Sequence, residues 1–81
     1  MTWQEINNKL EKEFVLKSFS EIIEKLNDVK IVANAMNHHP DFCVYGYKKI
    51  KFTLCTHDIG NTVTKNDHDL AEKIDEIFEQ K

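Results

Sequence analysis

The chain has 81 residues, with 11 basic residues against 14 acidic ones, a formal net charge of −3 and a pI near 5.7. This length fits one domain with a small core, so association between subunits would be a natural source of further stability. The acidic balance argues against a nucleic-acid binder that neutralises phosphates, and no apolar run approaches the roughly 20 residues of a membrane span.

Residues 3–16 predict a pair of strands joined by a tight turn. Asn7 and Asn8 suit that turn because asparagine tolerates a positive φ. After the turn, apolar residues alternate with acidic ones, which is typical of a half-buried strand. Lys12 breaks this alternation.

A helix is predicted next, beginning at Ser18. Ser18 and Glu21 fit a capping box, in which the hydroxyl accepts a backbone N–H and the carboxylate reaches back. The pattern stops near Asn37, and Pro40 excludes a helical conformation at His39. The apolar residues of this segment fall at spacings of three or four and form one stripe: Phe19, Ile22, Ile23, Leu26, Val29, Ala33 and Met36.

A second pair of strands and a second helix complete the chain. Residues 43–47 read as a short strand in which Gly46 supplies a bend. Residues 49–56 alternate cleanly, with Ile50, Phe52 and Leu54 on one face and Lys49, Lys51, Thr53 and Cys55 on the other. Residues 58–63 form a loop, after which Thr64 and Asp67 can cap a helix with one apolar face.

The predicted order of elements is therefore ββαββα, within a single domain that spans residues 1–81. Two helices with one apolar stripe each, and strands with one apolar face each, bury both by stacking the helices on one face of a sheet. We expect an α+β fold with a four-stranded antiparallel sheet and two helices on one side. The other face of the sheet must meet water or a second subunit.

Three histidines stand at junctions between the predicted elements, namely His38, His39 and His57. Histidine can both give and take a proton near neutral pH, so three such side chains in one cleft could carry acid–base catalysis. The simpler interpretation is that the adjacent pair is a solvated helix end. His68 fits an exposed position in the second helix.

Other chemistry finds little support in the sequence. No His or Cys pair has a usual zinc spacing, so no metal site is predicted. Cys43 and Cys55 are the only cysteines, and neither has a glycine-rich elbow beside it. The N-terminal residues lack a basic and an apolar region, so we expect no secretory signal, a cytoplasmic location and two reduced thiols rather than a disulfide.

The histidines belong to a wider pattern. His38-His39-Pro40, then Tyr47, then His57 after nine further residues, and then Asp67 closely resemble pterin-4a-carbinolamine dehydratases. Residues 50–57 and 67–71 also resemble that family, as does Trp3 together with residues 14–19. The resemblance covers nearly the whole chain, without the extra N-terminal helix of longer members.

The resemblance implies a cytosolic hydro-lyase that removes water from 4a-hydroxytetrahydropterin and yields quinonoid dihydropterin. Such enzymes help to recycle tetrahydrobiopterin for aromatic amino-acid hydroxylases, which makes such a hydroxylase a pathway partner. They use no metal and no bound cofactor, and they form homodimers or homotetramers. Neither a nucleic acid nor a membrane is an expected partner.

The resemblance also implies the site. The counterparts of His38, His39 and His57 line the pterin site, and we expect His39 and His57 to act as acid and base while His38 orients and stabilises. Further residues at positions expected to contact the substrate or to shape its site are Asn37, Pro40, Phe42, Cys55, Thr56, Asp58 and Asp67.

Two positions depart from the family pattern. Asn34 stands where an ionisable residue is usual, and Asn37 stands where an aspartate is common. Carboxylates there would hold an imidazole tautomer or favour its charged form. Their loss leaves an alternative open, in which the chain is a catalytically weak relative that acts as a binding or oligomerisation module.

Overall fold

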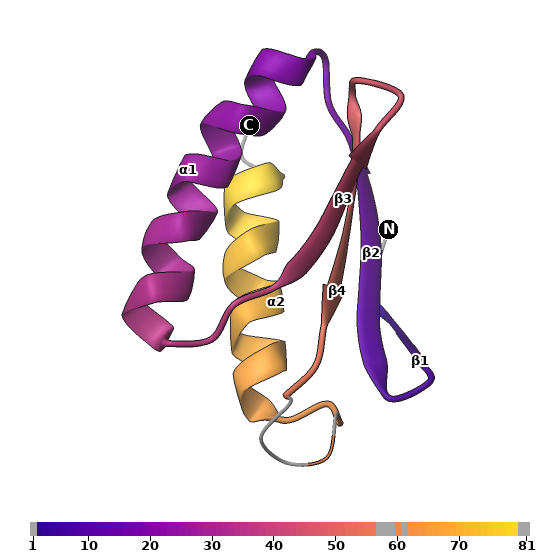
Figure 1. Ribbon diagram of the computed structural model, residues 1–81, viewed down its shortest axis with the longest axis vertical. Coiled ribbons are helices and arrows are strands. Elements are labelled where there is room, and N and C mark those ends of the chain that lie inside the picture. Colours follow the sequence, from indigo (N-terminus) through magenta and orange to yellow (C-terminus); the bar gives the residue numbers. More distant parts are fainter. Residues whose placement is uncertain (1, 57–59, 61, 80–81) are drawn as a thin grey trace.

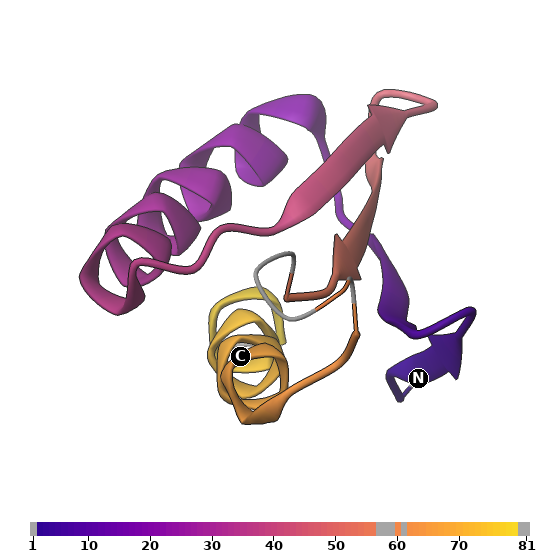
Figure 2. The ribbon, with the colours of Figure 1, turned by 60° about the horizontal axis from the view of Figure 1, so that its bottom comes forward.

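The computed structural model describes residues 2–56, 60 and 62–79. Its elements, in chain order, are β1 (Gln4–Ile6), β2 (Lys9–Val15), α1 (Phe19–Met36), β3 (Asp41–Tyr45), β4 (Lys49–Leu54) and α2 (Lys65–Phe78). The four strands form one antiparallel sheet in the order β1-β2-β4-β3. Both helices cover the same face of that sheet, so the predicted α+β architecture is confirmed (Figures 1 and 2).

The turns between paired strands follow the local chemistry. Asn7 and Asn8 both have positive φ, at 52° and 63°, which is the conformation of a type I′ hairpin turn. Gly46 and Tyr47 also have positive φ, at 57° and 53°. The predicted strand over 43–47 is therefore wrong at both ends, because β3 begins at Asp41 and gives way to this turn after Tyr45.

The core lies between the sheet and the two helices. Ile50, Phe52 and Leu54 of β4 face it, as predicted from their alternation, and Leu70 and Ile74 of α2 pack against them. The α1 stripe is wider than the face that α1 buries. Ile22, Val29 and Ala33 are buried, whereas Phe19 and Ile23 are exposed.

The beginning of α1 differs slightly from the predicted capping box. The Ser18 hydroxyl accepts the backbone N–H of Glu21 at 3.1 Å, as expected. The Glu21 carboxylate, however, accepts the N–H of Lys17 at 2.9 Å. The carboxylate thus reaches one residue further back than the capping box requires.

Lys12, which interrupts the alternation of β2, points to the core side of the sheet. Its side chain is 3% exposed, and its Nζ donates to Asp75 Oδ1 at 2.7 Å and to Glu79 Oε1 at 3.2 Å. Trp3 Nε1 donates to the same Asp75 oxygen at 3.0 Å. The break in the pattern therefore marks an ion pair that joins β2 to α2.

Cys55 corrects a second expectation. Its predicted place was on the outer face of the sheet with Lys49 and Lys51, but β4 ends at Leu54 and Cys55 is buried. The alternation no longer decides its direction, because the residue lies just beyond the strand. Cys43 is exposed on β3.

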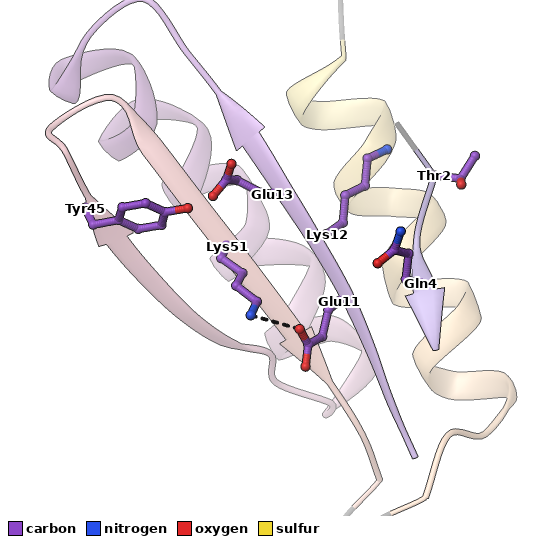
Figure 3. A pocket seen from close by; sticks show the side chains of 7 residues that line it. All are labelled: Thr2, Gln4, Glu11, Lys12, Glu13, Tyr45 and Lys51. Carbon is purple, nitrogen blue, oxygen red and sulfur yellow. Dashed lines mark ion pairs between the residues drawn. The ribbon is translucent and has the colours of Figure 1, made fainter. Parts of the chain in front are cut away.

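The outer face of the sheet carries charged side chains. Lys51 of β4 and Glu11 of β2 form an ion pair across it at 2.8 Å, and the hydrogen bond that Lys51 donates to Glu11 is the main reason that the pKa of Lys51 is raised. This pair lies in a shallow hollow of about 290 Å³ that also contains Gln4, Glu13 and Tyr45 (Figure 3). None of the residues predicted for the site lines it. No described helix has the length and apolar character to cross a membrane.

Candidate active site

The end of α1 sets the direction of the two consecutive histidines. Asn37 caps the helix in the left-handed conformation, with φ 53° and ψ 41°, a common way for a helix to end. The N–H of His38 then donates to the carbonyl of Ala33 at 3.1 Å. Asn37, predicted to contact substrate, thus has a backbone role at this turn, and its contact with substrate stays a prediction.

His38 faces the beginning of α2. Its Nε2 lies 2.6 Å from Oδ1 of Asp67, whose side chain is fully buried, while the His38 side chain is 13% exposed. The other carboxylate oxygen of Asp67 accepts hydrogen bonds from the Thr56 hydroxyl and from the Thr64 backbone N–H, both at 2.9 Å. The ends of α1 and β4 therefore meet the start of α2 at one carboxylate.

The charge of Asp67 follows from these contacts. Burial alone would raise the pKa of Asp67, but the hydrogen bonds from His38, Thr64 and Thr56 lower it, so the net pKa lies below 3.8. The group is therefore an ionised carboxylate at neutral pH. An ionised carboxylate only accepts hydrogen bonds, so Nε2 of His38 must carry a hydrogen and Nδ1 is the remaining ring nitrogen.

His39 turns back toward α1 instead. Its Nε2 lies 2.9 Å from Oδ1 of Asn34, in the last turn of that helix. The ring borders a hollow of about 240 Å³ between α1 and the start of β3. The walls of this hollow are mostly apolar, from Leu26, Val29, Ala33, Pro40 and Phe42, and Lys30, Asn34 and His39 supply its polar groups.

The predicted site residues thus fall into two neighbouring groups that are joined by the His38–His39 peptide bond. His38, Thr56 and Asp67 form the buried polar cluster. His39, Pro40 and Phe42 line the apolar hollow. Cys55 precedes Thr56 and is buried. His57 and Asp58 lie outside the described residues, so their part in the site stays a prediction.

Two members of the site were not predicted as such. Thr64, expected only as a helix cap, also pairs with the hydroxyl of Thr56, with 2.6 Å between the two oxygens. Asn34, which in the sequence is a departure from the family pattern, is the partner of His39. Among the described residues, no group of three His, Cys, Asp or Glu side chains is placed to hold a metal ion.

Comparisons with known proteins bear on this arrangement. The family model described as pterin 4 alpha carbinolamine dehydratase matches residues 1–77. The chain is 45% identical over 76 residues to a Sulfurisphaera tokodaii protein named "Putative pterin-4-alpha-carbinolamine dehydratase", covering 94% of this chain and 80% of that protein. A protein of the same name from Picosynechococcus is 37% identical over 75 residues, which make up 93% of this chain and 79% of that protein.

Solved structures share the fold. The crystal structure of a transcriptional coactivator/pterin dehydratase from Brucella melitensis matches with a TM-score of 0.87 at 28% sequence identity. The match covers 94% of this chain and 81% of the Brucella chain. A pterin dehydratase-like protein, identified as a RuBisCO assembly factor in the alpha-carboxysome, matches with a TM-score of 0.76 at 19% sequence identity. The match covers 95% of this chain and 89% of that protein, and it supports the fold alone. With the family match over residues 1–77, these relatives establish that the chain belongs to the pterin-4-alpha-carbinolamine dehydratase family.

Proposed function

We propose that this protein dehydrates a 4a-hydroxytetrahydropterin to the quinonoid dihydropterin by histidine acid–base catalysis. The observation that carries the proposal is the contact between His38 and the buried, ionised Asp67, beside a second imidazole at the edge of an apolar hollow. Family membership supplies the substrate class. The two imidazoles have different partners, and this difference suits them to different roles.

His38 is suited to be the acid. A carboxylate in hydrogen-bond contact stabilises the positively charged imidazolium, as it does in serine hydrolases. In the proposed step, the bond between carbon 4a and the hydroxyl oxygen breaks and its electron pair leaves with the oxygen. A proton from Nδ1 of His38 joins that oxygen, and water is released.

His39 is suited to be the base. In its neutral form it accepts the proton of the neighbouring ring nitrogen, and the electron pair of that N–H bond becomes the new double bond to carbon 4a. After the step, His38 has lost one proton and His39 has gained one. Proton exchange with water returns both rings to their starting protonation states. This division differs from the expectation that His39 pairs with His57 and His38 orients, and a contribution from His57 remains a prediction.

The apolar hollow suits a flat heterocycle. Pockets for such ligands combine apolar walls with a few polar groups that fix orientation. Phe42 is half exposed and packs against the buried Phe52, with 6.0 Å between the ring centroids. One side of the Phe42 ring therefore contacts the core. We therefore place the pterin ring against Phe42 and Pro40, with His39 at its edge.

Decay of 4a-hydroxytetrahydropterin tests the proposal. We expect His38→Ala and His39→Ala each to lower kcat by about 10²–10⁴, the usual contribution of one acid or base. His68→Ala is the matched control, because His68 is exposed and stands next to Asp67 in α2; its kcat should equal that of the wild type. Wild-type decay no faster than in buffer would contradict the proposal.

The same measurement addresses the alternative of a catalytically weak binding or oligomerisation module. Asn34, which replaces an ionisable residue of the family pattern, favours that alternative. A wild type without catalysis that still self-associates would support it. If the protein is active, we propose that it works in the cytoplasm, in the pathway of an aromatic amino-acid hydroxylase, as a homodimer or homotetramer.

A further inference from the structure

We propose that Asn34 is a positioning residue that holds His39 in the neutral Nε2–H tautomer, so that Nδ1 is the atom that accepts the proton of the substrate. This inference rests on the proposed function and assigns one atom of the base. It concerns a residue at which the chain departs from its own family pattern.

The turn at the end of α1 creates the contact. Asn34 lies in the last turn of the helix, and the left-handed Asn37 reverses the chain so that His39 returns over that turn. The two side chains meet with 2.9 Å between His39 Nε2 and Asn34 Oδ1. A carbonyl oxygen of an amide can only accept, so the ring nitrogen that faces it must donate.

The neutral amide is what separates the two histidines. Asp67 places a full negative charge against His38, whereas Asn34 offers His39 an acceptor oxygen without net charge. An aspartate at position 34 would instead place a carboxylate against each of the two rings. With Asn34, one imidazole is suited to carry the proton and its neighbour to receive one.

Charged side chains near His39 come from α1, β3 and α2. Lys30, one turn before Asn34 on α1, lines the same hollow as His39. From the strand side, the nearest acidic residue in the sequence is Asp41 at the start of β3, and it is exposed. Asp67 is already engaged by His38, Thr56 and Thr64.

Nitrogen NMR of the imidazole rings tests the contact without any reference to activity. In ¹⁵N-histidine-labelled protein above the pH at which the ring titrates, we expect the two-bond ¹H–¹⁵N pattern of the Nε2–H tautomer for His39, assigned by its loss in His39→Ala. In Asn34→Ala the pattern should become a mixture of both tautomers, and kcat should fall several-fold with little change in KM. An Nδ1–H pattern in the wild type would overturn the inference.

A charge at position 34 provides the second test. Asn34→Asp keeps an acceptor oxygen and adds a negative charge, so the limb of the pH–rate profile that reports the base should move to higher pH by about 0.5 units. Asn27→Asp is the control, because Asn27 is exposed like Asn34 but lies two turns earlier on the same helix, about 10 Å along its axis, where solvent and salt screen its charge from His39. Equal shifts in both variants would contradict a specific role for Asn34.

The two proposals fail in different ways. A wild type that does not accelerate dehydration refutes the proposed function, whatever tautomer His39 adopts. A wild type that is active but carries the Nδ1–H tautomer refutes only the role of Asn34. Activity and tautomer unchanged in Asn34→Ala would also refute that role alone.

Discussion

Asp67 links the stability of the fold to the proposed chemistry through one carboxylate. It caps α2 through the N–H of Thr64, fixes the hydroxyl of Thr56 at the end of β4 and holds His38. Because its pKa is lowered from 3.8, its ionised form contributes stability above that unfolded value. This contribution is lost as the pH falls through the still lower pKa of the folded protein.

We therefore predict that Asp67→Asn is less stable at neutral pH and less sensitive to acid. Asparagine keeps the shape but loses the charge-assisted hydrogen bonds, so the free energy of unfolding at pH 7 should fall by about 1–3 kcal/mol. Urea unfolding measured from pH 7 to below 3.8 should show the wild type converging toward the variant as the carboxylate becomes protonated.

Asp69→Asn is the control for that comparison, because Asp69 pairs with the exposed Lys65 on the surface of the same helix. Its unfolding curve should nearly overlay that of the wild type at every pH. If Asp67→Asn lost no stability at pH 7, or if the gap did not narrow in acid, the role assigned to the buried carboxylate would be wrong.

Contacts at the residue scale were predictable only where they are local in sequence. The Thr64–Asp67 cap of α2 follows from a three-residue spacing and is confirmed. His38 and Asp67 are 29 residues apart, so their pairing depends on how α1 and α2 pack, which no spacing encodes. The Asn34–His39 contact depends on the left-handed conformation of Asn37. Asparagine tolerates that conformation, but its presence in the sequence does not predict it.

At the scale of elements, periodicity predicted β2, β4 and the two helices because each of these four buries one face. The same rule failed at Lys12, where a charged residue is buried because Asp75 of α2 and Glu79, just after that helix, supply two carboxylates. It also failed at Cys55, which follows the last residue of β4. Both failures occur where a partner element, rather than the local pattern, decides the direction of a side chain.

Lys12 gives a prediction about the docking of α2 on the sheet. Its aliphatic part lies in the core and its Nζ lies 4.8 Å from the centroid of the Phe14 ring, so truncation removes packing as well as charge. We expect Lys12→Ala to lower the free energy of unfolding by about 1–3 kcal/mol and Lys12→Met to lower it by less, because methionine refills the apolar space. Urea unfolding at neutral pH measures both.

The matched control is Lys51→Met, which removes a lysine from an ion pair on the outer face of the sheet (Figure 3). The unfolding transition of that variant should stay close to the wild-type one, since exposed pairs contribute little. The interpretation of Lys12 as a buried link between β2 and α2 would be wrong if Lys12→Ala unfolded at the same urea concentration as Lys51→Met.

At the scale of the whole molecule, both helices lie on one side of the sheet, and no helix within the described part of the chain covers the opposite face (Figure 2). Val15, Lys49 and Tyr45 stand in one row across this face, because Lys49 is in register with the other two. Val15 is 60% exposed and Tyr45 is 41% exposed. β3 is also an edge strand, whose outer backbone groups are available for pairing.

We propose that the protein self-associates through this face and edge, because a chain of 81 residues gains stability by covering such surface. Sedimentation at micromolar concentration should detect species larger than 9.5 kDa. Val15→Lys and Tyr45→Lys should shift the distribution toward that mass, whereas Ile31→Lys, at an equally exposed apolar site on α1, should not. A wild type that sediments only as the monomer would exclude self-association at these concentrations. An effect confined to Ile31→Lys would place the interface on α1, because the sheet surface would then contribute nothing.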